Sequence, residues 1–329
     1  MKKLFNAMLA ASILFTACKK TETTIAEQVI DEDQLPELPL GSRHCVSYEV
    51  LQEQLKADPG LQQRMDEIEA FTNRFIKGEI PQTNTLQPNG TMLIPVVVNV
   101  LYRNAVENIS AAQIQSQIDA LNEDFAATNS DYNATSTYKS VKSGDTKIRF
   151  VLDLVVRKET NKKSWGTNDA MKKENRGGID PTSPTTKLNI WVCNLGGGIL
   201  GYAQFPGGKS ATDGVVCDNN AFGRTGTVEA PYNKGRTATH EIGHWLNLLH
   251  IWGDANCGND LVADTPPHNT ANFGCPAAGH MSTCSPAMVE MTMNYMDYTD
   301  DACMYMFSIG QKTRMQATYA VGGPRASFR

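Results

Sequence analysis

The spacing of three histidines constrains the fold of this chain more than any other feature of its 329 residues. His240, His244 and His250 lie within eleven residues, although the whole chain has only six histidines. At about 100° per residue, the first two project from the same face of a helix, one turn apart. A continued helix would turn His250 almost to the opposite side. If the three imidazoles converge, the helix must end before His250, and Asn247 suits that end because Asn tolerates the left-handed conformation.

This pattern predicts a metal site. Two imidazoles at positions i and i+4 suit Zn²⁺, and a site with three histidine ligands keeps a fourth position open, as catalytic zinc sites do. Glu241 directly follows the first histidine, so its carboxylate lies beside the ligands, where it can serve as a general base. Zinc lowers the pKa of a bound water from about 15.7 towards 7, which indicates metal-assisted hydrolysis of an amide. A single histidine would more often be structural; the prediction depends on the spacing of all three.

The segments around this motif predict a sheet covered by helices. Residues 92–101 (MLIPVVVNVL) are almost continuously apolar, which is typical of a strand buried on both faces. Further strands are predicted at 147–156, 187–193, 201–205 and 214–218. Capping-box spacing at 110–113 and 308–311 predicts helices that continue to about 125 and 320. The apolar residues expected to pack the histidine helix against the sheet are Ile242, Trp245, Leu246 and Leu249. The expected fold class is α/β (α+β) with a mixed sheet.

The first 18 residues are expected to be a lipoprotein signal peptide. Two lysines precede an apolar run from Leu4 to Phe15, which is too short to span a membrane core of roughly 30 Å. Residues 14–18 (LFTAC) resemble the bacterial lipobox, which makes Cys18 the predicted lipidation site. The alternative is an ordinary secretory signal with an incidental cysteine. Residues 19–42 are polar and acidic and are expected to be a flexible tether.

The signal segment predicts the location and partners of the protein. A lipoprotein would lie at the bacterial outer membrane or cell surface, with release into the medium as the alternative. The lipid anchor would be its only contact with the membrane. A net charge of −5 offers no basic face for phosphates, so no nucleic-acid partner is expected. The oligomeric state is left open, with a monomer as the expectation.

Residues 43–80 are predicted to be a small helical segment ahead of the main domain, which takes residues 81–329. Apolar residues recur at threes and fours between 48 and 75, and Pro59-Gly60 interrupts them, so two short helices are expected. Residues 78–90 contain Gly, Pro and Asn and are expected to form an exposed linker that is a candidate cleavage region.

The histidine motif resembles a known family signature. HExxHxxNxxH is similar to the metzincin metallopeptidase pattern HExxHxxGxxH, with Asn247 in the position of the Gly. Residues 240–246 (HEIGHWL), 251–254 (IWGD) and 293–298 (MNYMDY) are similar to the pappalysin family, in particular its bacterial ulilysin-like branch. The resemblance covers the chain from about Arg43 to its end. It implies a metzincin-type catalytic domain with a twisted mixed sheet, a zinc-binding helix and a Met-turn, preceded by a helical prosegment.

The resemblance also implies an activity and roles for individual residues. The chain would be an exported zinc endopeptidase that acts on protein or peptide substrates. His240, His244 and His250 would bind zinc, and Glu241 would be the general base. Met296 would form the apolar floor of the site, and the Tyr298 hydroxyl would stabilise the tetrahedral intermediate. Core packing is the alternative for Met296 and Tyr298.

The cysteines acquire roles from the same resemblance. Arg43-His44-Cys45 resembles a cysteine switch, in which the Cys45 thiolate occupies the fourth zinc position until the prosegment is removed. A free or structural cysteine is the alternative. The family pattern implies the disulfides Cys257–Cys284 and Cys275–Cys303, although four cysteines allow three pairings. The two remaining cysteines, Cys193 and Cys217, lie on two predicted strands and are expected to form a third bridge.

Two further sites are implied. Relatives bind calcium in the loop after the zinc helix, where this chain has the oxygen donors Asp254, Asp260, Asp264 and Thr265. A solvated acidic loop is the alternative. Relatives also present an acid beyond the Met-turn to the residue that follows the cut, and Asp301 is preferred here over Asp300. That carboxylate would favour cleavage before Arg or Lys.

Two other functions remain open at this point. The chain could be a non-catalytic surface binding lipoprotein that retains a metzincin scaffold. It could also be a metal-sequestering protein in which Cys45 is never removed. Both alternatives depend on whether the prosegment is cut away.

Overall fold

The computed structural model describes residues 43–81, 90–134 and 137–328. The predicted signal peptide, the tether and Cys18 therefore lie outside the described residues, as does most of the predicted linker. Among the described residues, no helix is long and apolar enough to cross a membrane. The helices are α1 (Ser47–Ala57), α2 (Leu61–Ile76), α3 (Ala111–Ala126), α4 (Arg236–Trp245) and α5 (Ile309–Tyr319). The strands are β1 (Met92–Tyr102), β2 (Ile148–Glu159), β3 (Leu188–Cys193), β4 (Gly201–Ala203) and β5 (Val215–Asp218).

The five strands form one mixed sheet in the order β2-β1-β3-β5-β4. All neighbours are parallel except β4, which pairs antiparallel with β5 and forms one edge. In β3 and β5 every residue is buried, and β1 is largely buried, because helices and loops cover both faces of the sheet. The α/β class and the mixed sheet are confirmed.

The local sequence signals explain where several elements begin. The Ser110 hydroxyl accepts a hydrogen bond from the Gln113 N–H at the start of α3, and a complete capping box between Ser308 and Gln311 starts α5. Pro59-Gly60 separates α1 from α2, as the interrupted apolar pattern predicts. These predictions depend only on local backbone geometry, and the structure confirms them.

Every residue of helix α4 is buried. Ile242, Trp245 and Leu246 are fully buried in the main core beside the sheet. The prediction that Leu249 also packs against the sheet is wrong. Leu249 packs with Leu51 and its neighbours in the segment before β1. Helix α4 ends at Trp245, and Asn247 adopts a left-handed conformation with φ 70°, as the spacing of the histidines requires.

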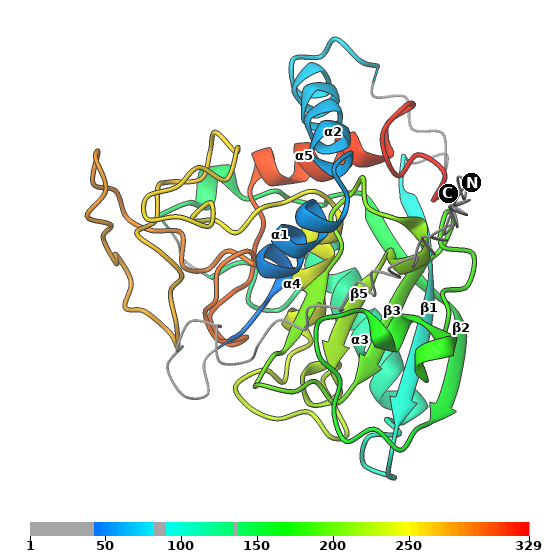
Figure 1. Ribbon diagram of the computed structural model, residues 1–329. Coiled ribbons are helices and arrows are strands. Elements are labelled where there is room, and N and C mark those ends of the chain that lie inside the picture. The colour runs from blue at the N-terminus through cyan, green and yellow to red at the C-terminus, as the bar shows by residue number, and fades with distance from the viewer. Residues whose placement is uncertain (1–42, 82–89, 135–136, 329) are drawn as a thin grey trace, which may run out of the picture.

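Beyond α4 the chain forms long loops that contain little regular structure. Figure 1 shows them in yellow and orange on one side of the molecule, opposite the sheet. Two disulfides, Cys257–Cys284 and Cys275–Cys303, join these loops, each with a Cα–Cα distance of 5.6 Å. Such bridges typically stabilise a fold by about 2–4 kcal/mol each. They compensate for the low content of backbone ladders in this region.

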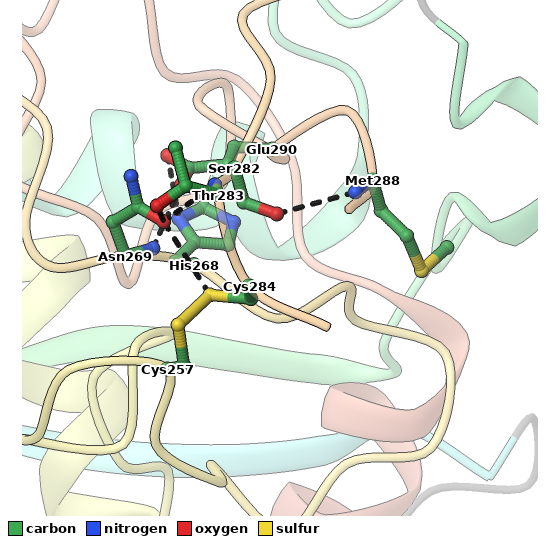
Figure 2. The surroundings of a disulfide bond; sticks show 8 residues. All are labelled: Cys257, His268, Asn269, Ser282, Thr283, Cys284, Met288 and Glu290. Carbon is green, nitrogen blue, oxygen red and sulfur yellow. Dashed lines mark hydrogen bonds and ion pairs between the residues drawn. A yellow bond between two sulfur atoms is a disulfide. The ribbon is translucent and has the colours of Figure 1, made fainter. Parts of the chain in front are cut away.

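Side-chain hydrogen bonds reinforce the first of these disulfides. Figure 2 shows that Asn269 lies beside the Cys257–Cys284 bridge and contacts two different segments. Its side-chain oxygen accepts hydrogen bonds from the Thr283 N–H at 2.8 Å and the Thr283 hydroxyl at 3.1 Å. Its backbone N–H donates to Glu290 at 2.8 Å. The loops are therefore fixed by polar contacts as well as by the covalent link.

The third bridge expected between Cys193 and Cys217 is not formed, and both thiols are free and buried. Cys193 lies opposite Asp218 in the pairing of β3 with β5, so it is offset from Cys217 by one residue. Side chains alternate between the two faces of a sheet, and an offset of one residue therefore places the two thiols on opposite faces. Cys217 belongs to the main core and Cys193 to the core on the other face.

The segment before β1 packs across the rest of the molecule. Helix α1 crosses the centre near α4, and α2 lies against α5 (Figure 1). Two apolar clusters hold this segment: one contains Leu51, Leu61 and Phe205, and the other contains Phe75 and Ala317. The buried guanidinium of Arg314 on α5 also donates two hydrogen bonds to the Glu69 carboxylate, at 3.0 and 2.8 Å.

Candidate active site

The three histidines of the motif converge. The Nε2 atom of His244 lies 3.1 Å from Nε2 of His240 and 3.1 Å from Nε2 of His250. Cys45 joins them, so that one ligand atom from each of the four residues lies within 4.8 Å of the others. Within the described part of the chain, no other group of three or more His, Cys, Asp or Glu side chains lies close enough together to hold a metal ion. Three imidazole nitrogens and one sulfur are a donor set that fits tetrahedral zinc.

The other ring nitrogens fix the orientation of the imidazoles. Nδ1 of His240 donates to the Tyr295 carbonyl at 2.7 Å, and Nδ1 of His244 donates to the Leu248 carbonyl at 2.8 Å. Nδ1 of His250 bonds the carboxylate of Asp254. These bonds leave the Nε2 lone pairs directed at the metal position. Burial and the neighbouring histidines lower the pKa of His240 and His244, which favours the neutral form that binds zinc.

Met296 lies directly beneath the histidine helix and is fully buried. The Asn294 side chain accepts a hydrogen bond from the Met296 N–H at 2.9 Å, and the Met296 carbonyl accepts one from the Ile251 N–H at 3.1 Å. A Cβ atom at Gly243 would collide with the Met296 sulfur. Gly243 is therefore needed inside the motif because it lets the turn at Met296 approach α4.

Glu241 lies beside the cluster and points towards the segment before β1. One carboxylate oxygen, Oε2, is 3.3 Å from the Cys45 sulfur and 2.9 Å from the Ser47 hydroxyl, which donates to it. The side chain is almost completely buried, and this burial raises its pKa to about 7. A carboxylate with a pKa near 7 can take up a proton at neutral pH, as a general base must.

Tyr298 also contacts Cys45. Its hydroxyl donates a hydrogen bond of 2.6 Å to the Cys45 carbonyl. Its ring meets the His250 ring edge-on, with 4.9 Å between centroids and an interplanar angle of 88°. Tyr298 and Glu241 thus contact opposite ends of the Cys45 residue, close to the metal position.

Residues 44–46 extend the sheet at its β4 edge. The Leu200 N–H donates to the His44 carbonyl at 2.9 Å, and the Val46 N–H donates to the Gly201 carbonyl at 3.3 Å. Cys45 pairs with Gly201 as a parallel bridge. An exposed sheet edge is a common site for binding an extended peptide, and this chain fills it with its own segment.

Arg43 inserts into a buried pocket at the start of α4. Its Nη2 atom lies 2.5 Å from Oδ1 of Asp301, and both side chains are at most 1% exposed. Nη1 donates to the Thr237 hydroxyl at 3.2 Å, and Nε donates to the Thr299 carbonyl at 3.3 Å. The guanidinium also lies 5.0 Å from the centre of the Tyr232 ring. All of these contacts recognise a planar cation.

Asp301 is held rigidly by the start of α4. Its second oxygen, Oδ2, accepts hydrogen bonds from the Lys234 N–H at 2.8 Å and the Arg236 N–H at 3.3 Å. The positive end of the helix therefore stabilises the buried carboxylate. Asp300, the neighbour, is more exposed than Asp301.

Comparison with known proteins identifies the family. Residues 184–320 match the family described as Pregnancy-associated plasma protein-A. An extracellular metalloprotease of Verticillium alfalfae is 34% identical over 242 residues, which cover 71% of this chain and 79% of that protein. This chain belongs to the pappalysin family of metallopeptidases. It is a zinc metalloendopeptidase, and its three-histidine group could hold the metal that the family implies.

Solved pappalysin structures resemble both parts of the chain. Mature mirolysin of Tannerella forsythia, in complex with a cleaved peptide, is 45% identical with a TM-score of 0.69, covering 72% of this chain and 95% of that one. A variant of promirolysin from the same organism is 40% identical with a TM-score of 0.75, covering 87% of this chain and 97% of that one. The precursor covers more of this chain than the mature form does. The chain therefore carries a prosegment ahead of its catalytic domain, and the protein is a metzincin zymogen.

The four residues predicted to bind calcium have different hydrogen-bond partners in this pappalysin. Asp254 bonds His250, whereas Asp264 accepts hydrogen bonds from the Ser308 hydroxyl and the Gly310 N–H at the start of α5. Asp260 and Thr265 contact each other at 2.9 Å. The carboxylates of Asp254 and Asp264 thus have other hydrogen-bond partners, and the four-residue calcium set stays a prediction.

Two features of the site were not predicted from the sequence. Ser47 binds Glu241, and nothing in the sequence marks this serine, because a single hydroxyl two residues after Cys45 has many possible roles. The partnership of Arg43 with Asp301 spans 258 residues of sequence. The sequence marked Arg43, near Cys45, and Asp301, beyond the Met-turn, as separate signals. The opposite charges of these two residues could have suggested that they pair.

Proposed function

We propose that this zymogen is an exported endopeptidase that cleaves peptide bonds before Arg or Lys once its prosegment has been removed. The observation that carries the proposal is the buried Arg43–Asp301 pair in the pocket at the start of α4. A prosegment that blocks a protease from within commonly occupies the positions that substrate would occupy. The side chain in that pocket therefore indicates the side chain that the pocket selects.

The pocket favours arginine over lysine. Asp301 uses one oxygen for the backbone N–H groups of Lys234 and Arg236 and offers the other to the incoming cation. The Thr237 hydroxyl and the Thr299 carbonyl lie where further N–H groups of a guanidinium can donate. Lysine brings a single compact ammonium and cannot make the same spread of contacts. Both residues would be accepted, with arginine the better substrate.

We propose the following roles for the residues at the zinc site. Bound zinc would act as a Lewis acid that acidifies water and polarises the scissile carbonyl. Glu241 would accept the proton of the attacking water and pass it to the leaving amine, for which its raised pKa is suited. The Tyr298 hydroxyl, which donates to the Cys45 carbonyl in the zymogen, would donate to the substrate oxygen as its negative charge develops. Such a donor typically contributes about 3 kcal/mol to lowering the barrier.

The same geometry supports latency through residues 43–47. The Cys45 sulfur would fill the fourth zinc position. The Ser47 hydroxyl donates a hydrogen bond to Glu241, the proposed general base. The Cys45 carbonyl accepts the hydrogen bond of the Tyr298 hydroxyl, and the Arg43 side chain fills the specificity pocket beside Asp301. Each group that substrate would need is therefore bound by the prosegment, and removing the prosegment would free all of them together.

Export and lipid anchoring are supported from outside the described residues. Relatives of this chain are named extracellular metalloproteases, including those of Verticillium alfalfae and Arthroderma otae. The lipobox-like residues 14–18 support lipidation of Cys18. Labelling of the expressed protein with a radioactive fatty acid, beside Cys18→Ala, would test the anchor.

Calcium binding remains a proposal, restricted to Asp260 and Thr265. The Thr265 hydroxyl oxygen lies 2.9 Å from both carboxylate oxygens of Asp260 and 2.9 Å from the Val262 carbonyl. One hydroxyl has only one proton, so it cannot donate to three oxygens at once. Carboxylate, hydroxyl and carbonyl oxygens are the ligands that Ca²⁺ takes in proteins. A calcium chelator should then lower the melting temperature of the wild type but not that of Asp260→Asn.

The function is tested with the whole chain, activated by limited proteolysis and incubated with a mixed peptide library. Cuts before Arg and, less often, Lys are expected, and they should disappear in the activated Glu241→Ala variant. Activated protein that leaves every peptide intact would favour the non-catalytic binding lipoprotein. Cuts without a basic residue after the bond would refute the proposed specificity while leaving the peptidase in place.

A further inference from the structure

The third zinc ligand, His250, differs from the other two in the partner of its Nδ1 atom, the ring nitrogen that does not face the zinc position. His240 and His244 project from α4, and their Nδ1 atoms donate to backbone carbonyls. His250 lies beyond the end of the helix, and its Nδ1 atom bonds a side-chain carboxylate, that of Asp254. The two side chains are 2% and 9% exposed. We infer that Asp254, together with Trp252, is a positioning residue that holds His250 in its metal-binding orientation.

The backbone around Asp254 supports this assignment. Gly253 and Asp254 both adopt left-handed conformations, with φ of 63° and 54°. A side chain at Gly253 would run into the backbone of Asn259, so glycine is required there. The left-handed conformation strains a residue other than glycine, although Asp tolerates it better than most. This turn brings the Asp254 carboxylate back onto the imidazole four residues earlier, and the hydrogen bond offsets the strain.

Trp252 restrains the same imidazole from its face. The Trp252 and His250 rings are stacked, with 4.3 Å between centroids and 7° between planes. Tyr298 meets both rings edge-on, at 4.9 Å from His250 and 4.7 Å from Trp252. The stack fixes the plane of the imidazole, and the hydrogen bond to Asp254 fixes which edge faces the metal. Together they replace the restraint that α4 gives to the other two ligands.

The charge of Asp254 has a further effect. A carboxylate that accepts a hydrogen bond from a ligating histidine makes the opposite nitrogen a stronger donor than a neutral carbonyl does. His250 should therefore be the strongest imidazole donor of the three. The inference rests on the zinc site and not on the proposed cleavage specificity, so either can fail without the other.

The decisive experiment measures zinc retention instead of activity. The zinc-loaded whole chain, before and after proteolytic removal of the prosegment, is mixed with a chromogenic chelator, and zinc transfer is followed. Losing such an outer partner typically weakens metal binding by about 10- to 100-fold, which is the expected loss for processed Asp254→Ala. Asp254→Asn, which keeps an acceptor oxygen and nearly the same shape, should lose less. The effect should be smaller in the zymogen, where Cys45 adds a fourth ligand.

A matched control separates positioning from general stability. Asp264 lies in the same loop as Asp254, but its carboxylate bonds the start of α5 and not a zinc ligand. Asp264→Ala is therefore the control. It should lower the melting temperature without a comparable loss of zinc. With cobalt in place of zinc, the visible absorption bands should shift in Asp254→Ala and Asp254→Asn but not in the control. If Asp254→Ala keeps zinc as tightly as the wild type, or loses it only as the control does at equal stability, the assignment is wrong.

Discussion

Replacing Asp301 by asparagine should remove the proposed preference of the activated enzyme for arginine after the cut. The substitution keeps the shape of the side chain but removes the charge that meets the guanidinium at 2.5 Å in the zymogen. Both partners are buried, so water cannot replace the lost interaction. A hydrogen bond to a charged group contributes about 1.5–3 kcal/mol. At about 1.4 kcal/mol per factor of ten, this corresponds to roughly 10- to 150-fold in relative rate.

The assay compares two peptides that differ only in the residue after the cut, which is arginine in one and citrulline in the other. Citrulline has nearly the shape of arginine and carries no charge. The ratio of the two kcat/KM values should be roughly 10–150 for the wild type and close to one for Asp301→Asn. The ratio also corrects for any general loss of activity that follows from the contacts of Asp301 with the start of α4.

The same variant should weaken latency. In the zymogen, Asp301→Asn leaves the Arg43 guanidinium buried without its counter-ion, and breaking a buried pair in this way costs about 3–5 kcal/mol. The variant zymogen should therefore be activated by lower amounts of an added protease. An unchanged arginine-to-citrulline ratio would refute the reasoning about the pocket. A changed ratio with unchanged latency would show that Arg43 contributes little to holding the prosegment.

Three other outcomes follow from the structure. Ser47→Ala in the zymogen frees the Glu241 carboxylate but leaves Cys45 in place. Peptide cleavage before activation should therefore rise above the wild-type background, but by less than it does in Cys45→Ala. Equal activity of the two single variants would contradict separate roles for Ser47 and Cys45. Burial raises the pKa of Asp124 to about 6, above its unfolded value of 3.8, so the native state favours the protonated form and the melting temperature should fall as pH rises from about 4 to 6. Asp124→Asn should lose this part of the pH dependence, which calorimetry at several pH values can measure. Residues 78–102 contain no Lys or Arg, so an enzyme that cuts before basic residues should process its own precursor at Ile76–Lys77, where Lys77 is exposed at the end of α2. Mass spectrometry of a Glu241→Ala precursor treated with activated enzyme should find a mature chain that begins at Lys77, just ahead of the linker 78–90 that the sequence indicates as a candidate cleavage region. A first residue between 82 and 91 would contradict the cut before Lys77.

Much of the fold could be predicted because its signals are local. The capping residues of α3 and α5 lie within three residues of the N–H groups that they bind. The break at Pro59-Gly60 follows from the backbone restrictions of those two residues. The convergence of the histidines was predictable for a similar reason, since helical periodicity and one left-handed residue, Asn247, determine it.

Contacts between distant segments could not be predicted in the same way. Leu249 is apolar, and the sequence cannot distinguish packing against the sheet from packing against the prosegment. Asp254 and Asp264 are both loop carboxylates suited to calcium, yet one bonds a zinc ligand and the other bonds the start of a helix. Their roles depend on which groups the loops bring within about 3 Å, and composition carries no information about that distance.

The sequence by itself determined the zinc-binding helix, its end, the helix starts and the order of strands and helices, because each depends on the conformation of a few consecutive residues. Only the tertiary structure decided the pairing of Arg43 with Asp301, the contact of Ser47 with Glu241 and the separation of Cys193 from Cys217. The last case gives the physical reason. Alternation along a strand is local, but the register between β3 and β5 is a property of the whole sheet, and a shift of one residue turns a side chain to the other face.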